Sequence, residues 1–501
     1  MSGAEEPVTQ DRAPDERSGS GLVLRGARLP GTAEPVSVLL RGGRIEAMGT
    51  GVEAGRGDDV RELDGRWLLP GLWDEHVHFS QWAMTAPRLD VSTAGSPREV
   101  AESVRARLIT APGPATLVGF GFRDGLWAEP PTTALLDEVS AERPVVLISG
   151  DLHCAWLNTA AYRRYGFPVH DDLLREDPCF ALVTALGALS DEDLDVLADT
   201  ASRRAAARGV VGVVDLEMRW NAEDWTRRVG SGIRSLRVET GVYRDHLDRA
   251  LAEGLRSGDE LPGGAGLLRM GPLKVLIDGS LNTRTAYCVD PYAGDDGRGA
   301  LTVDPAELDA LLARAAAGGI RSTVHAIGDA AATIALDALG RIGGGRIEHA
   351  QLLSDADLPR FAALGVEAGV QPAHALDDHD VADRYWAGRT GRAFALRSLL
   401  DSGATVVLGS DAPVAPLDPW VAISAAVARA LPGDEPWHPE QRVSVEEAIA
   451  ASTRVRRLCP QPGDVADLVV VDRDPLTADA GALRSMPVAA TLLAGRITHE
   501  L

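Results

Sequence analysis

The sequence predicts an α/β protein: a TIM-like (β/α)8 barrel, a small β-sandwich domain built from both termini, and an α/β insertion after the first barrel strand. From about Arg203 onward, apolar β-like runs alternate with Ala/Leu/Arg-rich helical stretches, and this alternation indicates a parallel sheet. Short β-rich pieces bounded by glycine turns occur only near the two ends. Residues 85–200 do not follow the strand–helix period, so we expect them to form the insertion.

Eight apolar runs are the predicted barrel strands, within a barrel domain that spans 68–457. They are residues 68–78, 209–215, 236–242, 273–277, 320–325, 346–349, 365–371 and 404–410. Eight strand–helix units fit a closed barrel better than an open sheet, and a barrel carries its chemistry at the carboxyl ends of the strands.

The two ends of the chain are expected to pair into one composite β domain made of 21–67 and 458–501. Their short strands would be poorly stable alone. Residues 1–20 are polar and lack an apolar core, so we expect a disordered N-terminus. Within the insertion, 144–149 is expected to be a strand and 159–165 a helix.

Composition restricts the classes of function. The 501 residues are 45% hydrophobic and 25% charged, which is ordinary for a globular protein with a large core. A formal net charge of −23 argues against nucleic acid or an anionic membrane as partner. We expect a small-molecule substrate, with a homodimer as the candidate assembly. Four widely spaced cysteines and the lack of an apolar signal or membrane segment are typical of a cytoplasmic protein.

Lys274 is the only lysine in the chain, and the other basic residues are arginines. Arginine stays protonated and cannot act as a nucleophile, whereas a buried lysine loses its proton readily. Lys274 interrupts an apolar run that is expected to be a buried strand. We therefore interpret it as a chemical residue; the alternative is a lysine on a solvated face.

Histidines at predicted strand ends outline a metal site. His76 and His78 are two residues apart on a strand, so both rings project to the same face. His325 and His349 end two later strands and Asp411 ends the eighth, which would bring all five into the mouth of a barrel. Four imidazoles and a carboxylate suit Zn²⁺, and also Mn²⁺, Fe²⁺ or Co²⁺. An ammonium group would repel the metal, so Lys274 must be neutral or modified to belong there.

On these motifs the chain resembles the amidohydrolase superfamily, and within it the branch that includes N-substituted formamide deformylase (amidohydrolase family 3). The resemblance runs almost end to end. The matching segments are 70–78, 152–158, 274–286, 325–329, 346–351, 371–374 and 409–414.

The resemblance implies a binuclear centre with two divalent metals, expected to be zinc. In such enzymes the lysine of the fourth strand is carboxylated by CO₂, and its carbamate bridges the metals. Carried onto this sequence, the ligands are His76, His78, Lys274, His325, His349 and Asp411. Asp411 is also the implied catalytic base, which takes a proton from the attacking water and passes it to the leaving nitrogen.

Five further residues are expected to contact the substrate. They are His153, Asn158, Asp278, Arg284 and His374. Alternatives remain for some of these residues. His153 could be a loop histidine with only local hydrogen bonds. Arg284 could pair with Asp278 and fix the loop, or it could bind a carboxylate of the substrate. Asn282 and Thr283 stand where the resembling branch usually has Gly-Ser, which adds bulk beside the site.

The predicted function is hydrolysis of a non-peptide carbon–nitrogen bond, in an N-acyl or N-formyl amide of a small molecule, by a metal-activated water. The enzymatic alternatives are ester or lactone hydrolysis, cyclic amide hydrolysis and deamination on the same centre, because a fold does not fix the substrate. A non-catalytic binding protein on the same barrel is the alternative from another class. The sequence leaves open the substrate, the metal and the oligomeric state.

Overall fold

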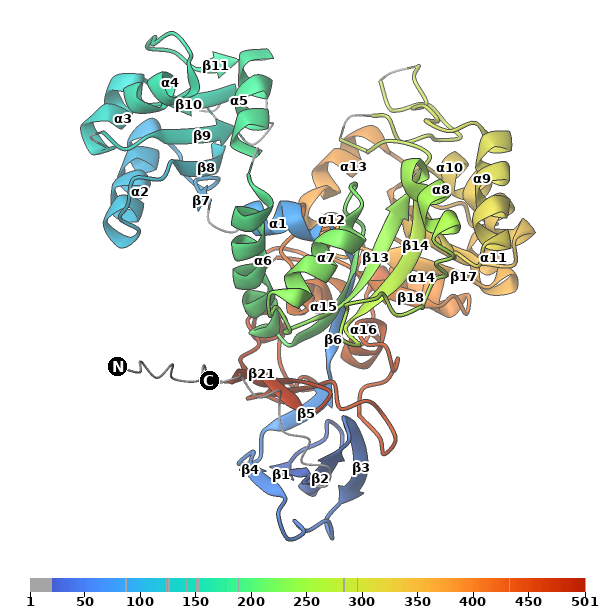
Figure 1. Cartoon of the computed structure of the whole chain (residues 1–501). Coiled ribbons are helices and arrows are strands. Elements are labelled where there is room, and N and C mark those ends of the chain that lie inside the picture. The colour runs from blue at the N-terminus through green and yellow to red at the C-terminus, as the bar shows by residue number, and fades with distance from the viewer. Residues whose placement is uncertain are drawn as a thin grey trace, which may run out of the picture.

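The computed structural model describes residues 20–500 except 86–87, 123, 125–126, 141, 150–153, 176, 188, 283, 295 and 432. Most of the described chain forms an eight-stranded parallel sheet surrounded by helices (Figure 1). The expected N-terminal disordered segment, apart from Ser20, and His153 both lie outside the described residues.

The eight barrel strands confirm the predicted TIM-like barrel. They are β6 (Leu72–Val77), β12 (Val210–Asp215), β13 (Arg237–Tyr243), β14 (Leu268–Leu276), β15 (Ser322–Ala326), β16 (Gly345–His349), β17 (Val366–Val370) and β18 (Val406–Leu408). Each strand pairs in parallel with the next in chain order, from β6 through β18. The ring closes where the backbone N–H of Asp411 donates to the carbonyl of His76 at 2.7 Å and that of His78 donates to the carbonyl of Ala412 at 2.8 Å.

Helices cover the outside of the barrel and bury its apolar outer face. They are α1 (Phe79–Thr85), α6 (Asp191–Ala206), α7 (Asn221–Gly230), α8 (Arg244–Ala252), α9 (Pro305–Ala317), α10 (Asp329–Arg341), α11 (Leu358–Leu364), α14 (Leu396–Asp401), α15 (Pro419–Ala428) and α16 (Val445–Ala451). Two short helices after β17, α12 (His374–Asp377) and α13 (His379–Tyr385), pack in a separate core through Ala375 and Ala382. Val213, Val238 and Val324 of the strands share one buried core with Leu336 of α10 and Trp420 of α15. These apolar strands are buried on both faces, which is why they appear in the sequence as continuous runs.

The predicted first barrel strand, 68–78, is two strands in the structure. Its first part is β5 (Trp67–Pro70), which pairs antiparallel with a C-terminal strand, and only β6 belongs to the barrel. The break falls at Pro70–Gly71. Pro70 has no N–H for a ladder, and a Cβ at Gly71 would lie 2.4 Å from Cγ1 of Val211, so the chain can turn closely here only with glycine.

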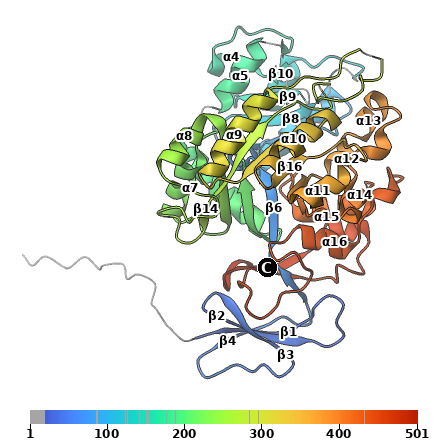
Figure 2. The ribbon, with the colours of Figure 1, turned by 90° about the vertical axis from the view of Figure 1, so that its right-hand side faces the viewer.

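Two four-stranded sheets form the β domain at the amino ends of the barrel strands (Figures 1 and 2). The first sheet contains β1 (Leu22–Ala27), β2 (Val36–Arg41), β3 (Arg44–Gly49) and β4 (Asp59–Glu62), and the second contains β5, β19 (Leu468–Val471), β20 (Val488–Leu493) and β21 (Arg496–Glu500). Leu24, Leu40, Leu68, Leu468 and Leu492 from the two sheets share one core. A short helix, α17 (Ala480–Arg484), lies between β19 and β20.

The insertion lies on the side of the barrel to which the strands' carboxyl ends point (Figures 1 and 2). It contains β7 (Leu89–Asp90), α2 (Pro97–Thr110), β8 (Leu117–Phe122), α3 (Thr133–Ser140), β9 (Val145–Ser149), β10 (Cys154–Leu157), α4 (Thr159–Tyr165), β11 (Leu174–Arg175) and α5 (Asp177–Gly187). The strand at 144–149 and the helix at 159–165 occur as predicted. Helix α6 packs against the barrel through Ala198, Ala201 and Ala205, so the insertion ends before the predicted residue 200.

Among the described helices, none is long and apolar enough to cross a bilayer.

Candidate metal centre

The predicted metal ligands converge at the carboxyl ends of the barrel strands. His76 is on β6, Lys274 on β14 and His325 on β15. His349 is the last residue of β16, and Asp411 follows β18 by three residues. The side chains come from strands on opposite sides of the ring, so only the closed barrel brings them together.

Three of these residues are close enough to hold one ion. One ligand atom each from His76, His349 and Asp411 lies within 4.8 Å of the others. The Oδ1 atom of Asp411 is 3.3 Å from Nε2 of His76 and 3.4 Å from Nε2 of His78. Backbone φ angles of +72° at His349 and +56° at Asp411 are uncommon outside glycine and are typical of functional sites, where the surrounding structure maintains them.

A second group of side chains adjoins the first. The ring centroids of His325 and His349 are 4.4 Å apart, and those of His349 and His374 are 6.1 Å apart. The Nζ atom of Lys274 is 3.3 Å from Nε2 of His76. The lysine is therefore adjacent to the first group.

Burial sets the protonation of these groups. Burial, and after it the charge of Lys274, lowers the pKa of His76 and lowers that of His325 to about 3. Burial also holds the pKa of His349 well below its usual range, so these imidazoles are neutral and can donate lone pairs to a metal. Burial lowers the pKa of Lys274 to about 8. For Asp411, burial alone would raise the pKa, but the imidazoles of His76 and His78 hold it well below its usual value.

Buried ring nitrogens without partners are a second indication that these residues can hold a divalent cation. Among the described side chains, Nδ1 of His78, Nδ1 of His349 and Nε2 of His374 are buried without a hydrogen-bond partner. An unpaired buried polar atom is costly. A metal ion or a bound substrate would provide partners for nitrogens in this cluster.

Outer contacts hold the ligands in place, and the sequence analysis missed them. Glu348 Oε2 is 3.0 Å from Nδ1 of His76, and Nε2 of Gln371 is 3.2 Å from the same nitrogen. Glu348 Oε1 accepts a hydrogen bond from Thr323 at 2.7 Å. The signal was an acidic residue immediately before the predicted ligand His349, inside the predicted strand 346–349.

A pocket of about 360 Å³ lies over these ligands. Its lining residues are His76, His78, Gln81, Met218, Tyr243, Lys274, Leu276, Ser280, Leu281, Asn282, His325, Ile327, His349, Gln351, His374, Asp378, Asp411, Pro413 and Val414. Apolar side chains from several loops form much of its wall. At its rim Asn282 Nδ2 donates to Oδ1 of Asp378 at 2.8 Å.

Of the predicted substrate residues, His374 lines this pocket and is buried. It begins α12, four residues beyond the end of β17. Asp411 lies in a loop three residues after β18 and does not end that strand as predicted. Arg284 is exposed, with its guanidinium 5.4 Å from the ring centroid of Tyr385.

Asn158 and Asp278 have structural roles in place of the predicted substrate contact. Asn158 is fully buried as the N-cap of α4. Its Oδ1 accepts from the backbone of Val145 and Ala161, and its Nδ2 donates to Ser140 and to the carbonyl of Arg143. The carboxylate of Asp278 accepts from the backbone N–H groups of Tyr287, Ile327 and Gly328, and Oδ1 is 3.4 Å from Nε2 of His325. It anchors the loop beside a metal ligand.

Comparisons with known proteins agree with this geometry. A protein-family profile described as "Amidohydrolase family" matches residues 59–499. The chain is 29% identical to Protein LONG AFTER FAR-RED 3 of Arabidopsis thaliana, covering 87% of this chain and 83% of that one. It is 27% identical to N-substituted formamide deformylase of Arthrobacter pascens, covering 93% and 95%. An uncharacterized metal-dependent hydrolase of Pyrococcus horikoshii superimposes with a TM-score of 0.76 at 25% identity, covering 92% and 99%.

Proposed function

Because the chain belongs to the amidohydrolase family, we propose that it hydrolyses a non-peptide carbon–nitrogen bond in an N-acyl or N-formyl amide of a small molecule. One observation carries this proposal: His76, His349 and Asp411 converge to within 4.8 Å beneath a pocket with apolar walls. The similarity to an N-substituted formamide deformylase over most of both chains supports the same class of bond.

We propose that two zinc ions occupy the centre, held by all six predicted ligands, with Mn²⁺, Fe²⁺ or Co²⁺ as alternatives. Lys274 would contribute as a carbamate. Its neutral amine nitrogen would attack the carbon of CO₂, the new N–C bond would form as one C=O π bond opens, and the nitrogen would release a proton to solvent. The low pKa of Lys274, about 8, supports this step, because only the neutral amine has the lone pair.

Divalent metal in this site, when bound, polarises a substrate carbonyl and acidifies water. Asp411 accepts the proton of the attacking water at its carboxylate and delivers it to the leaving nitrogen. Its low pKa keeps the carboxylate ionised before the reaction and makes it a weak base, which releases the proton readily to the leaving nitrogen. The buried Nε2 of His374, which has no partner among the described residues, is available to donate to the substrate carbonyl oxygen. The amide would then release a carboxylic acid and an amine.

The pocket's charges favour a substrate with an uncharged or cationic amine part. Among its lining residues, all within the described chain, the only ammonium or guanidinium group belongs to Lys274, inside the metal centre. Asp378 lies at the rim, and Met218, Leu281 and Val414 offer apolar surface. A substrate carboxylate would lack a cationic partner there. We therefore favour N-substituted formamides and acetamides with an apolar N-substituent.

A substrate panel tests this proposal. The panel compares N-alkyl and N-benzyl formamides and acetamides with N-formyl and N-acetyl amino acids, and with esters and lactones of similar size, in the presence of Zn²⁺, Mn²⁺ or Co²⁺. We expect kcat/KM for the apolar amides to exceed that for the carboxylate-bearing amides by at least about tenfold, because the pocket would leave the substrate carboxylate without a cationic partner. Turnover of esters or lactones without turnover of any amide would contradict carbon–nitrogen hydrolysis and indicate ester or lactone hydrolysis as the function.

A further inference from the structure

A line of alternating charges runs through the interior of the barrel and ends at the metal ligand His76. Glu348 Oε2 is 3.0 Å from Nδ1 of His76, and Glu348 Oε1 is 3.1 Å from Nε of Arg346. The guanidinium of Arg346 donates to Glu75 Oε2 at 2.8 Å. Glu75 Oε1 is 3.1 Å from Nε of Arg454. We call Glu348, Arg346, Glu75 and Arg454 the ion column.

The inner end of the ion column fixes the orientation of an imidazole. An ionised carboxylate can only accept hydrogen bonds, so Glu348 requires the Nδ1 of His76 to carry the proton. The Nε2 lone pair of His76 is then free on the side where Lys274 and Asp411 lie. Gln371 also lies beside Nδ1, at 3.2 Å, but as a neutral amide it cannot provide the charge-assisted hydrogen bond that Glu348 makes.

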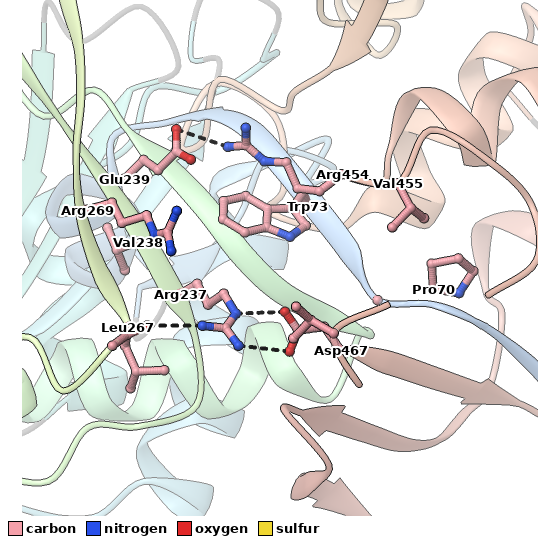
Figure 3. Close-up of a pocket in the computed structure, with 13 residues that line it drawn as sticks. Pro70, Trp73, Arg237, Val238, Glu239, Leu267, Arg269, Arg454, Val455 and Asp467 are labelled. Atoms are coloured by element: carbon pink, nitrogen blue, oxygen red, sulfur yellow. Dashed lines mark hydrogen bonds and ion pairs between the residues drawn. The ribbon is translucent and has the colours of Figure 1, made fainter. Parts of the chain in front are cut away.

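The outer end of the ion column lies in a different cavity, on the opposite side of the barrel from the metal centre. This cavity, of about 320 Å³, is lined by Trp73, Arg237, Glu239 and Arg454 among others. The first three lie at or near the amino ends of β6 and β13, and Arg454 lies in the loop after α16. Figure 3 shows Arg454 reaching toward Glu239, to which it is paired at 3.2 Å, and lying over Trp73, whose ring centroid is 4.0 Å from its Cζ.

We propose that the ion column positions His76 for metal binding, so that Arg454 is a positioning residue for a metal centre on the far side of the barrel. Glu75 lies between two guanidinium groups and Arg346 between two carboxylates. If Arg454 is removed, Glu75 has only Arg346 left as a cationic partner and draws it away from Glu348. Glu348 then holds Nδ1 of His76 less firmly, and the ligand loses orientation.

Burial makes this coupling strong. Glu75, Arg346 and Glu348 are each at most 8% exposed, and charges in such an interior interact more strongly than in water. Outer partners of a metal-bound histidine typically change metal affinity by about 10- to 100-fold when they are removed. We expect the largest effect at Glu348 and a smaller one at Arg454.

The test measures Zn²⁺ and Co²⁺ affinity of the full-length chain by competition with a chromophoric chelator, together with the visible spectrum of the Co²⁺ form. We expect Arg454→Met to weaken metal binding by about tenfold, Arg454→Lys by about threefold, and Glu348→Gln by more than Arg454→Met. The Co²⁺ bands should shift in each variant, because they report ligand geometry; a variant that was only less stable would keep the wild-type spectrum.

Arg237→Met is the matched control. Arg237 lines the same cavity but pairs with Asp467, at 2.7 Å and 3.1 Å, outside the ion column. This variant should keep wild-type affinity and spectrum. The double variant Glu75→Gln/Arg454→Met leaves Arg346 and Glu348 paired with each other, while Glu239 loses Arg454 and keeps Arg321 at 3.9 Å. It tests the column even if Arg454→Met alone folds poorly, and it should recover affinity to within about threefold of wild type.

Two sets of outcomes separate this inference from the proposed function on which it rests. Wild-type protein that binds neither metal would overturn both. Wild-type binding together with unchanged affinity and spectrum in Arg454→Met would overturn the positioning role alone. An equal loss in Arg237→Met, or no recovery in the double variant, would do the same.

Discussion

The Nζ atom of Lys274 lies 3.3 Å from Nε2 of His76, and both side chains are at most 2% exposed. Two positive charges at this distance in a buried site would repel strongly, so at most one of the groups is protonated. Burial lowers the pKa of both. The single lysine of the chain is thus held where it can lose its proton beside a metal ligand.

Replacing Lys274 with arginine should abolish function although the charge is kept. A guanidinium stays protonated and cannot form a carbamate, so we expect the variant to lose most of its bound metal and at least about 100-fold in kcat/KM. Metal per chain, measured by elemental analysis, and circular dichroism to verify folding would check this. Lys274→Ala should regain part of its activity with acetate or propionate. An arginine variant with full metal content and rate would exclude the carbamate.

Loading of the metal-free protein should depend on pH through Lys274. Its pKa is about 8, so the neutral amine rises from roughly a tenth of the population at pH 7 to roughly nine-tenths at pH 9. At a constant concentration of dissolved CO₂, the initial rate of activation by metal should therefore rise about tenfold over this interval. Stopped aliquots assayed at one common pH separate loading from catalysis. A rate that does not change with pH, or one that does not depend on CO₂, would contradict carbamate formation.

Much of the fold could be predicted from the sequence because the barrel strands are apolar on both faces. The start of the first barrel strand was predicted less accurately, because the run at 68–78 contains no polar residue before Asp74 and has the pattern of one strand. The pair Pro70–Gly71 was the available breaker signal. The structure shows what the break serves: Gly71 donates to the carbonyl of Asp467 at 2.8 Å, which belongs to the other end of the chain.

The candidate site could be predicted in its residue types but not in its outer contacts. Histidines at strand ends follow a rule of barrel geometry, so the convergence of His76, His349 and Asp411 was foreseeable. Glu348 was missed because its contact with His76 forms only when the barrel closes. Its pairing with Arg346 belongs to a buried charge network that the sequence does not reveal. Asn158 was assigned by resemblance to a motif. Its place directly before the predicted helix 159–165 was a capping signal that indicated the structural role.

Asp411→Asn should separate metal binding from proton transfer. The amide keeps an oxygen that can ligate, but it cannot accept the water proton. We expect kcat to fall by about 10²- to 10⁴-fold, with a smaller loss of metal. The loss of kcat should persist at saturating metal, which a titration with Zn²⁺ would show. A variant that keeps the wild-type rate would mean that metal hydrolysis is not the function of the chain.

Asn158→Ala should reduce stability without changing the chemistry. The substitution removes the cap of α4 and leaves the backbone N–H of Val145 and the hydroxyl of Ser140 without this partner inside the insertion. We expect a loss of about 2–4 kcal/mol in the local free energy of unfolding, measured as faster hydrogen exchange in β9 and β10.

Ser190→Ala, which removes the exposed cap of α6, is the matched control, with a loss of about 1 kcal/mol. Metal affinity and kcat/KM of the folded Asn158→Ala protein should match wild type. If Asn158→Ala instead keeps wild-type exchange rates and has a lowered kcat/KM, Asn158 contacts the substrate, as the resemblance implied.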